Sequence, residues 1–246
     1  RKLYNLNIDF YLLQGSAGFK IPELIEKRSV GTMIVDYSPL KIYRSRLKKV
    51  LQKVNIPSYQ VDTHNIIPVW AASDKKEYAA YTIRKKITSQ LNNYLTDIPK
   101  VIQHPFDGEK LKNKTFDKVI LSLNINHSVK EVDWLLPGET AAFDKLDYLK
   151  KGLKHYSVDR NNPNLKALSD LSPYFHFGQI SPQRVAFEIS KTQLPLEDKN
   201  AFLEEMIVRR ELSDNFCEYE PNYDFFEGFH PWAQKTLNEH RNDERE

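Results

Sequence analysis

Two pairs of side chains in the second half of the chain stand four residues apart, a spacing that brings side chains together on one face of an α-helix. Glu205 and Arg209 form the first pair, and Tyr156 and Arg160 form the second. A carboxyl beside a guanidinium can bind a polar ligand, and a guanidinium can hold a phosphate through two parallel hydrogen bonds. Structural roles are the alternatives: an exposed ion pair for Glu205 and Arg209, a half-buried aromatic for Tyr156, and a surface salt bridge for Arg160.

A short serine-containing segment, Leu168-Ser-Asp-Leu-Ser172, precedes Pro173. Ser172 is a typical N-cap residue and proline is favoured in the first turn, so the segment predicts a helix that begins here. The free N–H groups and the positive end of the helix dipole would suit a pyrophosphate, and Ser169 and Ser172 add hydroxyl donors. An ordinary capped helix without a ligand is the alternative.

Other familiar reaction centres have no counterpart in the sequence. There is no GxGxxG, P-loop or G-x-S-x-G motif. The single cysteine, Cys217, excludes a disulfide framework and a CxxC zinc ribbon. It is compatible with a reducing, intracellular compartment, without distinguishing nucleus from cytoplasm. His64 lacks a partner at metal-ligand spacing, so we expect no metal site.

The composition is that of a folded chain with an uneven distribution of charge. Of 246 residues, 40% are hydrophobic and 12% aromatic, too many for a disordered protein. Residues 1–150 carry 24 Lys and Arg against 16 Asp and Glu, and Lys41–Lys86 alone carries 11 against 3. This basic stretch is typical of a surface that meets phosphates, or of the solvent face of two helices. The longest apolar run, Ile66–Ala72, is much shorter than the roughly 20 residues of a spanning helix, so we expect no membrane insertion.

Strands alternate with helices in the first 60 residues. Apolar runs predict strands at 8–13, 30–36 and 57–62, and helices are expected at 21–28, with Pro22 in the first turn, and at 38–54. Such alternation favours right-handed βαβ units and a parallel sheet. We therefore expect part of a Rossmann-like α/β domain over residues 1–98, ending in one long helix at 74–98.

The second part is expected to be all-helical. Proline and glycine punctuate residues 99–140, which we interpret as a connector between domains. Helical periodicity then returns at 141–156, 181–192, 196–218 and 232–241. Trp70 and Trp232 are expected to pack in the core or between domains. The sequence thus predicts an α/β segment followed by the first part of an all-α domain over residues 141–246.

Four stretches of the chain carry recognisable motifs. They are Val61-Asp-Thr-His-Asn-Ile-Ile-Pro-Val-Trp70, Asp159-Arg-Asn-Asn-Pro-Asn164, Ala167-Leu-Ser-Asp-Leu-Ser-Pro-Tyr-Phe-His-Phe-Gly178 and Glu205-Met-Ile-Val-Arg-Arg-Glu-Leu-Ser-Asp-Asn-Phe-Cys217. Together they resemble the class II photolyases, the light-driven repair enzymes of cyclobutane pyrimidine dimers. The Leu-Ser-Pro-Tyr-Phe-x-Phe-Gly stretch is similar to the wider photolyase/cryptochrome family. The His-Asn-Ile-x-Pro and Val-Arg-Arg-Glu-Leu stretches are similar to class II.

The resemblance implies a Rossmann-like antenna domain, a connector and a helical domain that binds FAD and DNA. It implies repair of cyclobutane pyrimidine dimers in UV-damaged double-stranded DNA, by electron transfer from photoexcited reduced FAD to the flipped-out lesion. It also implies a second, light-harvesting antenna chromophore of unknown identity in the α/β domain. We expect the protein to be a monomer.

The resemblance also implies roles for particular residues. Glu205 is expected to hydrogen-bond the flipped-out pyrimidine pair, and Arg209 to stack on the lesion or to hold Glu205. The expected DNA contacts are Arg160, Glu205, Arg209 and Arg210, with a structural role as the alternative for Arg210. The expected flavin contacts are Tyr156, Leu168, Ser169, Asp170, Leu171 and Ser172. We expect the serine segment and the helix of Glu205 and Arg209 to border a single cavity.

Three alternatives remain open. The chain could be a cryptochrome-like flavin photoreceptor without repair activity, or a truncated chain that only binds DNA or is inactive. It could also be an unrelated α/β-plus-helical protein whose motif matches are accidental. Relative to the family, the opening strand and the helical part after about residue 246 are absent, so we expect the chain to be a fragment.

Overall fold

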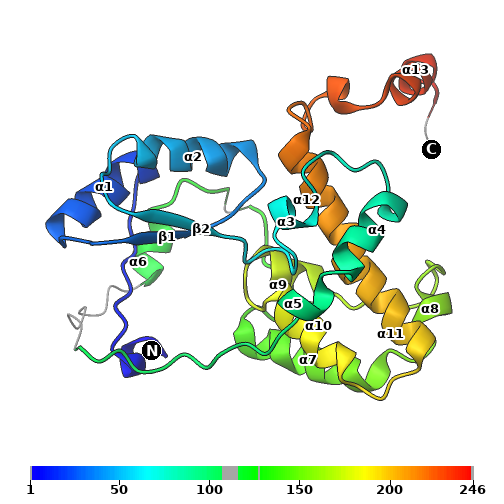
Figure 1. The fold of residues 1–246 in the computed structure, drawn as a ribbon, viewed down its shortest axis with the longest axis horizontal. Helices are drawn as coiled ribbons and strands as arrows, with labels where there is room; N and C mark the ends of the chain where they lie inside the picture. The colour runs from blue at the N-terminus through cyan, green and yellow to red at the C-terminus, as the bar shows by residue number, and fades with distance from the viewer. Residues whose placement is uncertain (1, 107–115, 127, 245–246) are drawn as a thin grey trace.

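The computed structural model describes residues 2–106, 116–126 and 128–244. Residues 107–115 and 127 of the predicted connector lie outside the described residues. The chain forms a small α/β unit joined to a larger helical body (Figure 1).

The α/β unit alternates helices with strands. Along the chain, the order is helix α1 (Ala17–Lys27), strand β1 (Met33–Asp36), helix α2 (Lys41–Leu51) and strand β2 (Ser58–Val61). The two strands pair in parallel, with Met33 opposite Ser58 and Asp36 opposite Val61. This parallel β–α–β arrangement confirms the alternation predicted for residues 30–62. In Figure 1, α1 and α2 lie together on one side of the sheet.

Helix α1 begins earlier than predicted and packs closely on α2. A Cβ atom on Gly18 would lie 3.1 Å from the Cβ of Lys49, so a larger residue would separate the two helices. Because the helix begins at Ala17, Pro22 lies inside it and not in its first turn, which corrects the prediction.

The strand predicted at residues 8–13 is not formed. This run follows a short 3-10 helix, η1 (Tyr4–Leu6), and is half-buried without pairing to β1 or β2. Hydrogen bonds flank it instead: the His104 N–H donates to the Leu6 carbonyl at 2.7 Å, and Gln14 Nε2 donates to Ser122 Oγ at 2.8 Å. Ser122 follows helix α6 (Phe116–Leu121), which Figure 1 shows on the side of the sheet opposite α1 and α2.

The long helix predicted at residues 74–98 is broken into shorter pieces. The structure has α3 (Val69–Ala72), α4 (Ala80–Thr88) and α5 (Leu91–Tyr94). Residues 73–79 stay outside helices because they bond to α12 (Arg210–Tyr219): Asn215 Oδ1 accepts the Glu77 N–H at 2.7 Å, and the Tyr219 hydroxyl donates to the Ser73 carbonyl at 2.7 Å.

The rest of the chain is helical, as predicted. Its helices are α7 (Glu139–Gly152), α8 (Tyr156–Asp159), α9 (Ser172–His176), α10 (Pro182–Ser190), α11 (Leu196–Leu203), the π-helix η2 (Glu204–Arg209), α12, the 3-10 helix η3 (Phe226–Gly228) and α13 (Pro231–Glu239). One hydrophobic core joins α7 to α12 with α3, α4 and α5, whereas η3 and α13 contribute no residue to it. Its fully buried members include Ile67, Ile83, Ile87, Leu146, Leu171 and Ile189. Residues 66–95, predicted in the α/β part, therefore pack into the helical core.

Helix α12 connects the α/β unit to the helical body. Glu218 accepts hydrogen bonds from the Tyr37 hydroxyl at 2.8 Å and from Arg44 at 3.0 Å, and Arg44 also donates to the Cys217 carbonyl. Trp70 packs edge-on against Tyr37 with ring centroids 5.4 Å apart. Trp70 is nevertheless 49% exposed, and Trp232 is 72% exposed, which corrects the prediction that Trp232 packs in the core or between domains. Among the described helices, none combines the length and the apolar character needed to cross a membrane.

Candidate functional site

The helix that carries Glu205 and Arg209 is interrupted by the π-helical turn η2. A π-turn has i→i+5 hydrogen bonds and occurs mostly as a single turn within α-helices, frequently at functional sites. Its wider turn changes which side chains meet. Arg209 lies nearest to Glu204, five residues earlier, with 3.8 Å between Nε and Oε1. The i,i+4 ion pair that the sequence allowed between Glu205 and Arg209 is not the pairing observed.

Glu205 pairs with Arg160 instead. Arg160 Nη1 donates to Glu205 Oε1 at 2.7 Å and also lies 3.3 Å from the Ala201 carbonyl. The guanidinium of Arg160 is 5.8 Å from the centre of the Tyr156 ring. Tyr156, Arg160 and Glu205, which the sequence placed in two separate pairs, therefore form one group at the junction of α8 and η2.

A buried aspartate on α11 holds α8 in place. The chain turns sharply between α7 and α8, where His155 has a left-handed backbone conformation with a φ of 65°. Asp198 accepts hydrogen bonds from the His155 N–H at 2.9 Å, the Ser157 N–H at 2.9 Å and the Ser157 hydroxyl at 2.7 Å. The Ser157 N–H bond is the main cause that lowers the pKa of Asp198, in spite of the opposing effect of burial. Asp198 thus fixes the turn that carries Tyr156 and Arg160.

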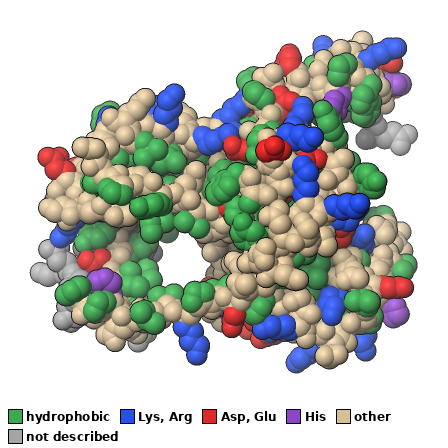
Figure 2. Space-filling view, in the orientation of Figure 1, with side chains coloured by type: hydrophobic (Ala, Val, Ile, Leu, Met, Phe, Trp, Pro, Cys, Tyr) green, Lys and Arg blue, Asp and Glu red, His purple; other side chains and the backbone are tan. Residues whose placement is uncertain are grey.

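Glu204 is held by an arginine from α4. Arg84 approaches both carboxylate oxygens, with Nη2 2.6 Å from Oε1 and Nε 3.1 Å from Oε2. This fork arrangement is the strong, directional form of an arginine–carboxylate pair. Arg209 stays 55% exposed beside it. Figure 2 shows Lys and Arg side chains along the face of the helical body formed by α4 and α12.

The serine segment does not form the predicted N-cap. Ser172 is the first residue of α9, Leu171 occupies the cap position, and no side chain caps the helix. The short length of α9 weakens the argument from the helix dipole. Asp170 has a φ of 53° and its carboxylate is 3.0 Å from Lys145 Nζ. Leu171 is fully buried, and its carbonyl accepts the Phe175 N–H at 3.0 Å, so neither its side chain nor its backbone is exposed to a ligand.

Two of the expected flavin contacts, Tyr156 and Leu168, line one cavity of about 260 Å³. The other lining residues are Tyr148, Leu149, Gly152, Leu153, Lys154, Asp159, Leu165, Lys166 and Ala167. Ser169 follows directly in the chain, and its hydroxyl accepts the Leu171 N–H at 3.4 Å. Glu205 and Arg209 do not line this cavity, which corrects the prediction of a single cavity. Tyr156 lines the cavity and also contacts Arg160, which binds Glu205.

Arg210 points inward and is at odds with its expected DNA contact. Its Nε donates to the Met206 carbonyl at 3.1 Å, and its Nη1 is 3.5 Å from His64 Nδ1. Burial lowers the pKa of Arg210, while Glu211 and Asp214 oppose this effect. The structure supports the structural alternative for this residue, because an enclosed guanidinium cannot reach a phosphate.

Glu211 is a buried carboxyl at the start of α12. It is 2% exposed, and its Oε1 accepts the Ile66 N–H at 2.7 Å and the Ile67 N–H at 3.4 Å. Burial raises the pKa of Glu211 to about 7, although these hydrogen bonds and Arg210 act in the opposite direction. Nearby, His64 Nδ1 is 2.6 Å from Asp214 Oδ2. The polar side chains of α12 therefore anchor the segment that enters the helical body from the α/β unit.

The sequence missed three residues of the site: Arg84, Asp198 and Glu204. Arg84 and Glu204 are 120 residues apart, so no local spacing could indicate their pairing. Asp198 lies in the first turn of a predicted helix, where acidic residues are common, so its position alone indicates only a favourable interaction with the helix dipole. Its hydrogen-bond donors, His155 and Ser157, are more than 40 residues away and could not be predicted. Within residues 2–106, 116–126 and 128–244, no cluster of three or more His, Cys, Asp or Glu side chains could hold a metal ion.

The chain is similar to known proteins over nearly its whole length. The sequence model of the family described as DNA photolyase matches residues 1–104. The deoxyribodipyrimidine photo-lyases of Potorous tridactylus and Arabidopsis thaliana are each 42% identical to the chain over 98% of its length. The chain covers 46% and 51% of these two proteins, so it spans about half the length of the curated relatives it matches.

Solved structures agree on the fold. The crystal structure of a class III photolyase from Agrobacterium tumefaciens superposes with a TM-score of 0.62 at 22% identity, over 83% of this chain and 44% of that one. A cryptochrome from Synechocystis gives a TM-score of 0.61 at 17% identity, over 85% of this chain and 46% of that one. The fold is therefore that of photolyases and cryptochromes, and in sequence the chain is similar to photolyases.

Proposed function

We propose that this chain provides the lesion-facing part of a light-driven enzyme that repairs cyclobutane pyrimidine dimers in DNA. The group of Tyr156, Arg160 and Glu205 carries the proposal. It joins a residue expected at the flavin to one expected at the lesion, through a hydrogen bond of 2.7 Å and a ring contact of 5.8 Å. The similarity to deoxyribodipyrimidine photo-lyases supports this reading. The motifs at His64 and at Arg209 support the narrower assignment to class II.

The residues around the cavity fit part of an FAD molecule. Sites for small ligands and cofactors usually measure about 300–1,000 Å³. The cavity of about 260 Å³ beside Tyr156 is therefore large enough for one portion of the dinucleotide but not for all of it. The hydroxyls of Ser169 and Ser172 follow in the chain and are donors that suit a phosphate.

We propose that FAD is held by Tyr156, Leu168, Ser169, Asp170 and Ser172, with the buried Leu171 fixing the segment in the core. Reduced FAD, when bound, supplies the photoexcited electron that opens the cyclobutane ring, because the difficult chemistry belongs to the cofactor. The second, light-harvesting chromophore and the division into units at residues 98 and 140 stay predictions of the sequence.

The chain's own residues would bind and orient the lesion. Glu205 offers a carboxyl, oriented by Arg160, to the polar edges of a flipped-out pyrimidine pair. Arg209 offers an exposed guanidinium that can stack on a base or bind a phosphate. Extrusion of a damaged base costs less than that of a paired one, which favours the dimer over normal DNA. UV-damaged double-stranded DNA is therefore the partner we propose.

Illumination of the protein with damaged DNA tests the proposal. The chain is supplied with FAD and a reductant, mixed with a duplex that carries one thymine dimer, and exposed to blue light, with a dark sample as control. Light-dependent loss of the dimer supports repair. If flavin binds but the dimer is not lost, the proposed repair function is wrong and a photoreceptor is favoured. If the chain binds DNA but not flavin, a chain that only binds DNA is favoured.

A further inference from the structure

The π-turn directs two neighbouring glutamates to arginines of two different elements. Glu204 meets Arg84 of α4, and Glu205 meets Arg160 just after α8. Both carboxylates of the π-turn are therefore already hydrogen-bonded to another guanidinium. Among the residues that the structure describes, Arg209 has one ion-pair contact, 3.8 Å from its Nε to Glu204 Oε1, beyond hydrogen-bond distance.

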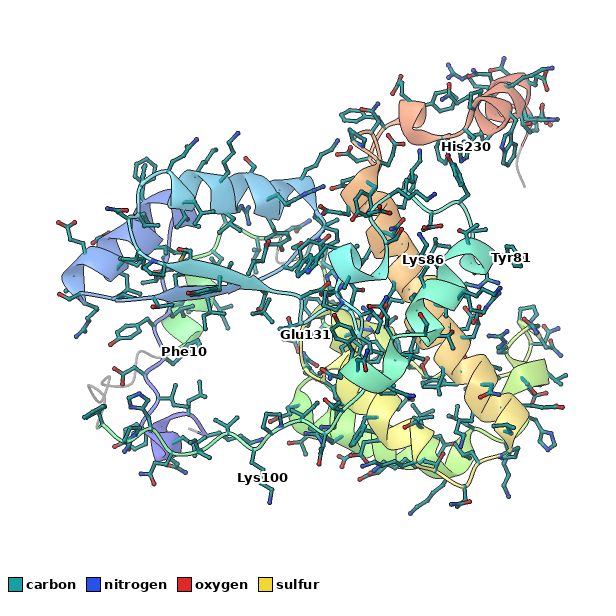
Figure 3. All side chains as sticks on the ribbon, viewed as in Figure 1. Phe10, Tyr81, Lys86, Lys100, Glu131 and His230 are labelled. Atoms are coloured by element: carbon teal, nitrogen blue, oxygen red, sulfur yellow. The ribbon has the colours of Figure 1, made fainter. Side chains whose placement is uncertain are left out.

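Arg84 is held firmly where it meets Glu204. The neighbouring Ile83 and Ile87 are fully buried in the hydrophobic core, which fixes the rotation of α4. Figure 3 shows Lys86 on the side of α4 that faces α12 and Tyr81 on the opposite side, so α4 keeps one face against the helical body. A guanidinium on a fixed helix that approaches both oxygens of a carboxylate is a pre-organised contact.

The geometry has a consequence for Arg209. If Arg84 were absent, Glu204 would be a carboxylate with 24% exposure and without its main partner, next to the guanidinium of Arg209. The two would then pair directly, because an arginine and a carboxylate form a strong charge-assisted hydrogen bond. Such a pair would turn Arg209 toward the π-turn and away from a ligand.

We propose that Arg84 is a positioning residue for Arg209: by occupying Glu204 it keeps the guanidinium of Arg209 available for damaged DNA. The identity of the ligand, damaged DNA, rests on the proposed function. Whether the guanidinium of Arg209 is free or paired with Glu204 does not depend on it. The proposal assigns Arg84 a role in ligand binding, exerted by occupying Glu204, beyond that of a structural ion pair.

Substitutions at the two positions separate this role from a structural one. Arg84→Gln should weaken binding to a dimer-containing duplex about tenfold, a change that corresponds to about 1.4 kcal/mol. Glu204→Gln should leave the affinity within about threefold of wild type, and Arg84→Gln with Glu204→Gln should recover it, since contacting residues show coupling of this size. A structural ion pair predicts equal losses for both single variants and no recovery.

A charge control and a direct observation of Arg209 complete the test. Lys235→Gln removes one positive charge from an exposed pair with Glu239 on α13 and should change neither affinity nor stability measurably. NMR of the Arg209 Nε–H should show slower exchange with water in Arg84→Gln than in wild type, and wild-type exchange in the double variant.

The two proposals can fail separately. If the wild-type chain does not prefer dimer-containing DNA, the proposed function is wrong, while the NMR measurement still decides the role of Arg84. If Arg209 exchange is the same in wild type and Arg84→Gln, the inference on Arg84 is wrong whatever the DNA result. Thermal unfolding of each variant shows whether it is folded, and Arg84→Lys, which keeps the charge but not the fork, should give an intermediate affinity.

Discussion

Arg160 Nη1 lies 2.7 Å from Glu205 Oε1, although 45 residues separate the two in the chain. The contact exists because α8 packs on α11, which continues directly into η2, and because Asp198 holds the turn into α8. Glu205 is thereby oriented by a guanidinium that itself lies over Tyr156. One arginine thus connects the residue expected at the lesion to the residue expected at the flavin.

Glu205→Gln should reduce recognition of the lesion without unfolding the protein. The amide oxygen can still accept from Arg160, and exposed ion pairs contribute only about 0–1 kcal/mol to stability, so the unfolding midpoint should hardly change. A lost hydrogen bond from a charged group costs about 1.5–3 kcal/mol, so the preference for dimer-containing over normal duplex should fall at least about tenfold. Fluorescence anisotropy with both duplexes measures it. Glu197→Gln, exposed on α11, is the control, and an unchanged preference in Glu205→Gln would contradict the assigned role.

Asp198→Asn should loosen α8. The substitution puts an NH₂ group where a carboxylate accepts from two backbone N–H groups and a hydroxyl, so one donor must lose its partner. A buried group without its partner costs about 1–3 kcal/mol of stability. Because the pKa of Asp198 is lowered on folding, its contribution is present above the unfolded pKa and is lost as the pH falls.

Urea unfolding at pH 7 and at pH 3, below the ordinary aspartate pKa of 3.8, checks this prediction. The difference in stability between wild type and Asp198→Asn should be larger at pH 7 than at pH 3. Asp144→Asn on α7, an exposed position, should match wild type at both values. A variant as stable as wild type at pH 7 would show that Asp198 does not hold the turn.

Patterns within one element could be predicted from the sequence, whereas contacts between elements could not. The β-branched run at 30–36 and the amphipathic helix after it predicted a parallel β–α–β unit, which the structure confirms. The apolar run at 8–13 looked similar but finds no strand to pair with, and a short apolar run carries no information about its neighbours. The helix predicted at 74–98 begins only at Ala80, because Asn215 Oδ1 accepts the Glu77 N–H, a contact across 138 residues.

The same limit explains what was missed at the site. Spacing of four residues correctly brought Tyr156 and Arg160 together. The same spacing did not pair Glu205 with Arg209, because their helix contains a π-turn. No residue pattern in the sequence predicted this turn. Arg84 looked like one charge among many in a basic stretch, and only the fold shows that it binds Glu204.

Leu168→Glu should weaken flavin binding while leaving the fold intact. Leu168 lines the cavity with Tyr156 but is 67% exposed, and exposed substitutions usually change stability by no more than about 0.5 kcal/mol. A carboxylate at this position would be desolvated by a bound isoalloxazine ring, or would repel a bound phosphate. The affinity for FAD should therefore fall at least about tenfold, which corresponds to 1.4 kcal/mol. Quenching of flavin fluorescence measures it. Val158→Glu, also exposed but outside the cavity lining, is the matched control, and equal losses in both variants would exclude this cavity as the flavin site.

Glu211→Gln should remove a dependence of stability on pH. Burial raises the pKa of Glu211 to about 7 in the folded protein, above its value in an unfolded chain. The folded state therefore binds an extra proton between the two values, and the contribution of Glu211 is fully present below the unfolded pKa and is lost as the pH rises through about 7. A shift of this size corresponds to a loss on the order of 3 kcal/mol.

Chemical unfolding at pH 5, 6, 7 and 8 measures the effect of Glu211→Gln against wild type. The amide stays neutral, and its oxygen can still accept the Ile66 N–H. The free energy of unfolding of the variant should therefore rise relative to that of wild type at each step up to pH 8. Glu77→Gln is the counterpart: burial raises the pKa of Glu77, but bonds from Lys86, Ser73 and Thr82 outweigh this and lower it to about 2. Glu77→Gln should lose nearly the same stability relative to wild type at each pH from 5 to 8, because the contribution of Glu77 is lost only as the pH falls from 4.5 toward about 2. A difference between Glu211→Gln and wild type that is constant from pH 5 to 8 would show that Glu211 does not change its protonation on folding.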